Sequence, residues 1–305
     1  MVWLAGVASS YKQAEVIFER IGHKHVPESS IWRQTKHKGK QLQNYIEHQQ
    51  ELISVERVKL PAPWEDHYQR KGVSMDGGMV HIRDEGWKEV KVGTVFDIVM
   101  KPERDPLTGE WAEYARADCM TYAAVLGGVD DFSKALWKVA FDANIPCTDQ
   151  SSVTADGAAW IWNIAADLFP DSSQIVDWYH AAQHLAAASH ALHPNDEQHA
   201  RQWCQKQKQS LYQGEIQLIT APLDAAGLSN HSHYFHTHKR RMQYHQFQDD
   251  GFPIGSGSVE SSIKQFKARL TGPGMRWSRA GAERMLVIRS SILSDSFDVL
   301  WNLAA

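Results

Sequence analysis

The amino-acid sequence predicts an α/β fold in which helices flank a mixed β-sheet. Three segments rich in β-branched or alternating apolar residues, 73–82, 87–100 and 113–126, follow one another with short loops between them. This pattern favours an antiparallel meander. From residue 130 to residue 192 the order is helix, strand, helix, strand, helix. Helices that alternate with strands in this way pack on the faces of the sheet that the strands join.

Helices are also expected before the sheet. In residues 10–22 apolar side chains fall near helical spacing, and Gly22 is a residue that ends helices. Residues 27–53 predict a second helix, which carries the basic stretch Arg33–Lys40. A turn followed by a basic helix is one way to bind DNA, but a helical scaffold with a solvated basic face explains residues 1–62 equally well.

The residues after the last predicted strand divide into an insertion and a C-terminal part. Residues 193–253 are polar, rich in Gln and His, and helical in pattern, so we expect a mostly helical insertion that packs less tightly. Apolar residues then recur at spacings of 4, 3 and 4 from Val259 to Leu270, which predicts an amphipathic helix. One last helix is expected over 280–303. The predicted core therefore comprises 63–192 and 254–305.

Composition and charge exclude some classes of protein. The chain has 305 residues, 43% hydrophobic and 22% charged, which is ordinary for a globular protein. No apolar run approaches the roughly 20 residues of a membrane-spanning helix, so no membrane partner is expected. Three isolated cysteines predict a reducing cytoplasm. The net charge of −4 argues mildly against nucleic acid, but basic residues concentrate between Lys264 and Arg289, and a local patch is what binds phosphate.

Three acidic residues occupy positions that suggest chemistry. Asp76 lies inside the first strand before two glycines, Asp156 ends the fourth strand, and Glu260 lies in the first turn of the amphipathic helix. If the first and fourth strands are neighbours, the two aspartates project from adjacent positions and the helix adds the glutamate. Converging carboxylates repel one another unless a cation joins them, and Mg²⁺ prefers oxygen ligands. Two such ions roughly 3.5–4 Å apart would activate a nucleophile at phosphorus.

Each of these residues also has a simpler interpretation. An Asp-Gly pair is usually a turn, although here two such pairs each fall on an apolar strand. Glu260 can be an acid near a helix N-terminus that pairs with Lys264, a contact worth only a few tenths of a kcal/mol. Trp277 lies among arginines and can pack in the core or stack on an unpaired base. The five histidines of His231–His245 indicate either a zinc site or a polar segment near DNA.

Five blocks of the sequence occur together in one known family. They are VSMDGG, VTADGAAWIWNIAADLFP, IVDWYHAAQHL, GFPIGSGSVESSIKQFKARL and MRWSRAGAERMLVIRS, in this order between Gly72 and Leu293. With them the chain resembles bacterial insertion-sequence DDE transposases, most nearly the ISKra type, which are distant relatives of Mutator-like transposases. The resemblance implies a ribonuclease H-like core, formed by 63–192 and 254–305, with an α-helical insertion before the final catalytic helix.

The resemblance also implies a site and an activity. The family's metal-binding Asp, Asp and Glu match Asp76, Asp156 and Glu260, which would hold two Mg²⁺ ions, or Mn²⁺ in their place. Asp177 and His180 match a short motif close to the site, although Asp177 can equally cap the following helix. The implied activity is cleavage of double-stranded DNA at transposon ends, followed by strand transfer into target DNA. The residues expected to contact DNA are Lys264, Lys267, Arg269, Arg276, Trp277 and Arg279.

Two other functions fit the same residues. One is a metal-dependent nuclease of the same fold, which cuts DNA without strand transfer. The other is a catalytically inactive, transposase-derived protein that only binds DNA. For the transposase, the resemblance implies a homo-oligomer assembled on DNA and a cytoplasmic, nucleoid-associated location.

Overall fold

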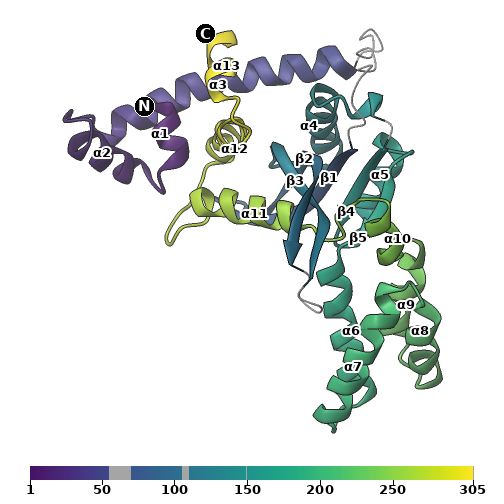
Figure 1. Cartoon of the computed structure of the whole chain (residues 1–305). Coiled ribbons are helices and arrows are strands. Elements are labelled where there is room, and N and C mark those ends of the chain that lie inside the picture. The colour runs from purple at the N-terminus through teal and green to yellow at the C-terminus, as the bar shows by residue number, and fades with distance from the viewer. Residues whose placement is uncertain (55–69, 105–109, 149, 305) are drawn as a thin grey trace.

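A five-stranded sheet lies at the centre of the computed structural model, which describes residues 1–54, 70–104, 110–148 and 150–304 (Figure 1). Its strands are β1 Arg70–Ile82, β2 Gly86–Arg104, β3 Trp111–Val125, β4 Gln150–Ala155 and β5 Ser173–Val176. They are arranged in the order β3-β2-β1-β4-β5. Because β2 pairs antiparallel with β1 and β3 while β4 pairs parallel with β1 and β5, the sheet is mixed, as predicted. The expected boundary at residue 62 lies outside the described residues.

Helices precede, interrupt and follow the strands. Before the sheet come α1 Val2–Val7, α2 Tyr11–Arg20 and α3 Glu28–Ser54. Between β3 and β5 come α4 Val129–Asp142, the short 3₁₀ turn η1 Ile145–Cys147 and α5 Ala159–Leu168. After β5 come α6 Trp178–Leu192, α7 Glu197–Tyr212, α8 Ile216–Ala225, α9 Ser229–His238, the 3₁₀ turn η2 Lys239–Arg241, α10 Tyr244–Asp249, α11 Gly257–Leu270, α12 Arg279–Leu293 and α13 Phe297–Leu303. Each of these described helices is too short or too polar to cross a bilayer.

The alternation of side chains along β1 divides the core between the two faces of the sheet. Val73 and Met75 are fully buried in a core that includes residues of α4 and α5. Val80 and Ile82 are buried on the other side, in a core that includes residues of α11 and α12. Successive side chains of a strand point to opposite faces. Asp76 therefore shares its face with Ile82 and is directed toward the side that α11 covers.

The close approach of α11 to the sheet depends on a glycine. A Cβ atom added at Gly78 would lie 3.3 Å from Cε of Lys267 and 3.5 Å from Cδ1 of Ile263, both on α11. A hydroxyl contact of 3.2 Å between Thr94 of β2 and Ser262 of α11 fixes the same crossing. The second glycine after Asp76 therefore makes room for the helix that carries Glu260. Both Asp-Gly pairs adjoin strands as expected, and the first lies within β1 without forming a turn.

The expectation of loose packing in residues 193–253 is wrong. Phe235 of α9 and Tyr244 of α10 are fully buried, and both belong to the same core as Val73 of β1 and Val153 of β4. Helices α6 to α9 extend from the β5 edge of the sheet (Figure 1). The sequence looks polar there because the helices expose their Gln and His side chains, while a few apolar positions anchor them.

The N-terminal and C-terminal helices pack together. Val2 of α1, Leu42 of α3, Ile288 of α12 and Phe297 of α13 form one buried cluster, and Figure 1 shows these helices side by side. The prediction of a single helix over 280–303 is wrong, because α12 and α13 are separated by a turn. Its Ser-Asp-Ser sequence offers side-chain partners that compete with helical hydrogen bonds, and Asp295 adopts a left-handed φ of 51°.

Candidate active site

The pairing of β1 with β4 ends directly before the two predicted aspartates. Met75 of β1 is aligned with Ala155 of β4, and the strands run parallel. Asp76 and Asp156 are the residues that follow this aligned pair, so their backbones leave it in the same direction. Because residues 75 and 155 both face the core, the next residues are directed toward the opposite face of the sheet.

Local hydrogen bonds hold each aspartate in place. One carboxylate oxygen of Asp76 accepts the N–H of Gly77 at 2.6 Å. One carboxylate oxygen of Asp156 accepts the N–H of Ala158 at 2.9 Å, directly before α5. Between these two residues Gly157 has a φ of +110°, a conformation that residues with a Cβ rarely adopt. The glycine after Asp156 is therefore required by the turn that presents the carboxylate.

Asp177 connects two helices and is completely buried. It is the N-cap of α6, and its Oδ1 accepts the backbone N–H of His180 at 2.8 Å and contacts Nδ1 of the same imidazole at 3.1 Å. Its Oδ2 accepts the backbone N–H of Ser256, the residue that precedes α11. The helix-capping interpretation of Asp177 is thus confirmed, and the same carboxylate also anchors the start of the helix that carries Glu260.

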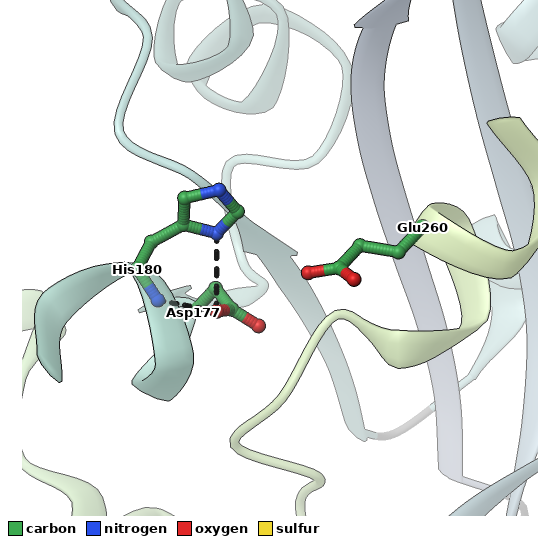
Figure 2. A group of neighbouring side chains, drawn as sticks. All are labelled: Asp177, His180 and Glu260. Atoms are coloured by element: carbon green, nitrogen blue, oxygen red, sulfur yellow. Dashed lines mark hydrogen bonds and ion pairs between the residues drawn. The ribbon is translucent and has the colours of Figure 1, made fainter. Parts of the chain in front are cut away.

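Glu260 completes a compact group with Asp177 and His180. It lies in the first turn of α11, and its side chain points toward the other two residues (Figure 2). Ligand atoms of these three residues lie within 4.8 Å of one another. Among the described residues this group alone satisfies that spacing, so Asp76 and Asp156 stand outside it. The sequence did not indicate that Asp177 and His180 lie this close to Glu260.

The pKa of Asp76 responds to the charges of three of these groups, Asp156, His180 and Glu260. Burial raises the pKa of the Asp76 carboxyl, and the negative charges of Asp156 and Glu260 raise it further. The N–H of Gly77 and the imidazole of His180 oppose this shift without cancelling it. The pKa of His180 is raised, mainly by its hydrogen bond to Asp177 and also by the charges of Asp156 and Glu260. The centre therefore carries more negative than positive charge.

The donor set of this centre suits a hard divalent cation. Hydrogen bonds occupy one oxygen each of Asp76 and Asp156, and Glu260 has only an ion pair of 3.9 Å with Lys264. Carboxylate oxygens are the ligands that Mg²⁺ takes in proteins, alongside water and phosphate oxygens. Like charges repel, so carboxylates that share no cation stand further apart than metal ligands do. By donor chemistry the acids named from the sequence could hold such an ion, whereas the described group with metal-ligand spacing is Asp177, His180 and Glu260.

The helices after β5 contribute aromatic residues that the sequence did not indicate. The hydroxyl of Tyr234 on α9 donates to the backbone carbonyl of Asp156 at 3.4 Å, and His184 of α6 stacks on the Tyr234 ring with centroids 3.6 Å apart. Burial and the nearby charge of Asp156 raise the pKa of Tyr234. Its distance of 78 residues from Asp156 hid this contact, and the mostly polar sequence of α9 gave no signal that Tyr234 packs inward.

The five histidines between His231 and His245 do not gather into a zinc site. His236 pairs with Asp224 at 3.0 Å, His245 pairs with Asp249 at 3.0 Å, and His238 contacts Arg241. They therefore face different partners along α9 and α10, as alternating helical positions dictate. The zinc alternative is not supported by the described residues, among which no group of histidines has metal-ligand spacing.

The residues predicted to bind DNA separate into exposed and buried sets. Lys264, Lys267 and Arg276 are exposed, whereas Arg279 is engaged with Glu85 through two nitrogen atoms. The prediction of a DNA contact is wrong for Arg269, which is 2% exposed and donates from Nε to the carbonyl of Ala5 at 2.8 Å.

Base stacking by Trp277 is also contradicted. Only 9% of this residue is exposed, and its indole N–H donates to the carbonyl of Leu270 at 3.0 Å. Arg269 and Trp277 fall on the inner side of their segments because α11 and the loop after it pack on the sheet and on α1 and α2.

Comparisons with known proteins add no family assignment. No protein-family model matches the chain, and no curated protein matches it.

Proposed function

We propose that this chain is a DDE-type transposase that cuts DNA in a metal-dependent reaction and transfers the cut strand to target DNA. The observation that supports the proposal is the position of Asp76 and Asp156, which directly follow the aligned residues Met75 and Ala155, with Glu260 in the first turn of the helix that covers this face of the sheet. These acids come from two strands and a helix that are far apart in the sequence. The negative charges of Asp156 and Glu260 both raise the pKa of Asp76. Neighbouring, partly buried carboxylates cost folding free energy unless a bound cation neutralises them.

The topology supports the finer assignment to a ribonuclease H-like fold. Three antiparallel strands followed by two parallel strands on the β1 side are compatible with that fold. The helices α7 to α10 lie between the last strand and the helix that carries Glu260, where the resemblance expects a helical insertion. Both features agree with a catalytic core built from 63–192 and 254–305.

Each residue has a distinct role in the proposed reaction. Asp76, Asp156 and Glu260 would hold the ions, which supply a polarised nucleophile and stabilise the leaving oxygen at phosphorus. Asp177 fixes the orientation of the His180 ring and of the first turn of α11. Lys264 and Lys267 lie one and two turns after Glu260 on an exposed surface of α11, where they can attract the phosphate backbone.

A nicking and joining assay tests the proposal. Supercoiled plasmid and a labelled duplex with the DNA that flanks the reading frame would be incubated with the protein and millimolar Mg²⁺ or Mn²⁺. We expect nicks and label joined to plasmid with wild type, and neither product with Asp76→Asn or Glu260→Gln. Asp167→Asn, which removes an exposed carboxylate from α5, is the matched control and should react as wild type does.

Metal binding is tested separately from catalysis. An ion that binds only the folded chain stabilises it by about 2.7 kcal/mol at a hundredfold excess over its Kd. Mg²⁺ should therefore raise the melting temperature of wild type and Asp167→Asn, but not that of Asp76→Asn. Nicks without joined label would assign a nuclease. DNA binding without any nick would assign the binding-only protein, and either result would refute the transposase.

A further inference from the structure

A cleft of about 840 Å³ lies at the far end of α11 from Glu260. Its walls come from α2, the first half of α3, the turn between β1 and β2, the loop from residue 271 to 278 and the start of α12. The loop is held against the sheet because the N–H of Arg83 donates to the carbonyl of Trp277 at 2.8 Å. The cleft is thus built from both ends of the chain, and it is separate from the carboxylates of the active site.

The charge of the cleft is strongly positive. Five basic residues line it against a single acid, Asp84; they are Lys36, Arg83, Arg269, Arg276 and Arg284. Within the described parts of the chain, none of these five forms an ion pair with a carboxylate. Surface lysines and arginines that lie near acids commonly form ion pairs with them, as Arg279 does with Glu85 beside the cleft. Such exposed pairs add little to stability. The unpaired cations leave a positive field that favours an anion.

The inner wall of the cleft holds a buried cation. The guanidinium of Arg269 lies between the rings of Tyr11 and Trp277, 4.9 Å from each ring centroid. Its Nε is bonded to Ala5, but its Nη2 is buried and finds no hydrogen-bond partner among the described residues. A buried charge without full compensation is costly. A bound anion in the cleft would offset that cost, since the charge of Arg269 adds to the field there.

An aromatic side chain stands at the rim. Trp32 of α3 is 48% exposed, lines the cleft, and has the ammonium group of Lys36 5.5 Å from its ring centroid. Exposed aromatic rings among cations are the means by which proteins hold unpaired bases and phosphates together. The volume lies within the range of about 300–1,000 Å³ that encloses small ligands. A cleft of that size admits a single strand, whereas a duplex would rest outside it.

The position of the cleft along α11 relates it to the active site. Glu260 lies at the first turn of the helix and Arg269 at its last turn. At a rise of about 1.5 Å per residue these two positions are about 14 Å apart along the axis. At the 3.4 Å rise per strand of duplex DNA that length is about four nucleotide steps, so an extended unpaired strand covers it in about four nucleotides or fewer. Figure 1 shows α11 running from the sheet toward α2, so one strand could follow the helix from one end to the other.

We infer that the cleft binds an unpaired stretch of a nucleic-acid strand, with phosphates on Lys36, Arg276 and Arg284 and a base stacked on Trp32. The choice of DNA as the strand rests on the proposed function, but binding in the cleft does not require cleavage. The strand is then held a few nucleotides from the acids, at the other end of α11. Binding in the cleft would keep the nucleotides beside the cleavage position unpaired from the complementary strand.

Binding without cleavage tests the inference. A short fluorescein-labelled single strand would be titrated with the protein in EDTA, and anisotropy would be measured over a range of salt concentrations. We expect the double variant Arg276→Ala/Arg284→Ala to bind at least tenfold more weakly. Its slope of log K against log salt should fall by about 1.4, because each phosphate contact on a single strand contributes about 0.7.

A second variant separates stacking from charge. Trp32→Ala should weaken binding by roughly 5- to 150-fold, the range for one stacked base, and should leave the salt slope unchanged. Trp32→Leu keeps an apolar side chain and should lose as much. The matched controls are Arg201→Ala on α7, where an exposed arginine pairs with Glu197, and Trp111→Ala, an exposed tryptophan at the start of β3. Both should bind as wild type does.

The outcomes distinguish this inference from the proposed function. Two results would overturn the inference that the cleft binds an unpaired strand, even if wild type nicks DNA. One is unchanged binding by the cleft variants, and the other is equal competition by duplex and single-stranded DNA for the labelled strand. Binding that depends on these residues, in a protein that never nicks, would support the cleft and refute the transposase. Tighter binding of single-stranded RNA than of DNA would overturn the choice of DNA.

Discussion

Substitution of Asp177 by Asn should destabilise the protein more than its small chemical change suggests. The carboxylate accepts from His180 with one oxygen and from the N–H of Ser256 with the other. Asparagine is a good N-cap, so its single oxygen can still accept the N–H of His180. The NH₂ group of the asparagine then lies against the N–H of Ser256, so two hydrogen-bond donors face each other in the buried interior.

The magnitude follows from the lost hydrogen bond. A hydrogen bond to a charged group contributes about 1.5–3 kcal/mol, and leaving a buried donor unsatisfied costs about 1–3 kcal/mol. Because these two figures describe overlapping parts of the same change, we expect Asp177→Asn to lose about 2–4 kcal/mol of unfolding free energy. A typical domain has about 5–15 kcal/mol, so the variant should still fold.

The loss should depend on pH in a defined direction. Burial raises the pKa of Asp177, but hydrogen bonds from His180 and Ser256 outweigh it and hold the pKa below its ordinary value of 3.8. The stability from Asp177 is therefore present above pH 3.8 and lost as pH falls through the folded pKa. His180 has a raised pKa, so its contribution is complete below pH 6.5 and is lost as pH rises through the folded pKa. The difference between wild type and variant should be largest between pH 3.8 and 6.5.

A second Asp-x-x-His motif in the chain supplies the control. Asp196 caps α7 and accepts the N–H of His199 at 2.9 Å and contacts its Nδ1 at 2.5 Å. Its side chain is 50% exposed, and no third hydrogen bond links it to another element in the described chain. Urea unfolding in EDTA near about pH 5.5 and 8.5 should show that Asp196→Asn costs less than about 1 kcal/mol. Equal losses for the two variants would refute the claim that Asp177 locks α11 to α6.

Two further predictions concern the core. A Cβ at Gly72 would overlap the Phe96 ring, so Gly72→Ala should lower the free energy of unfolding in urea by about 1–3 kcal/mol. The control Gly257→Ala has open space around the added Cβ and should change stability by less than about 1 kcal/mol. Equal effects of the two substitutions would contradict the packing at Gly72. Burial, with a smaller contribution from Arg241, lowers the pKa of His238 to about 4, so its stability is present above pH 6.5 and lost as pH falls. Between about pH 7.5 and 5, the unfolding free energy of His238→Gln should therefore fall by about 2 kcal/mol less than that of wild type. The control His245→Gln, on the exposed side of α10, should lose as much as wild type does. A pH profile of His238→Gln equal to that of wild type would contradict this.

Periodicity was sufficient to predict most helices and strands but not where helices end. The alternation in residues 73–82 and the 4, 3 and 4 spacing in α11 reflect one-sided burial, which any packing partner produces. The break at Asp295 depends on local hydrogen bonds of serine and aspartate, and apolar spacing does not report them. The burial of residues 193–253 depends on a few anchors such as Phe235, which average hydropathy conceals.

The site was predictable to the extent that it depends on strand order. Asp76 and Asp156 could be related because they follow the aligned ends of the parallel β1–β4 pairing, and Glu260 because its helix covers that face of β1. The bond from Asp177 to Ser256 spans 79 residues, and neither residue type nor spacing indicates it. Arg269 was misassigned although a signal existed. It follows Phe266 by three positions on the apolar side of α11, so its burial could have been expected.

In the proposed reaction, the fixation of α11 would let the carboxylates and the distant cleft act on one strand. Asp177 holds the start of the helix through Ser256, Gly78 lets its middle lie against β1, and Arg269 ties its end to the carbonyl of Ala5. A helix held at three points transmits little relative movement between its ends, because protein interiors are close-packed. The spacing between the acids and the cleft is therefore set by the number of residues in α11. On this proposal the N-terminal helices would aid strand placement by fixing the far end of this helix, in addition to the contacts proposed for Lys36 and Trp32.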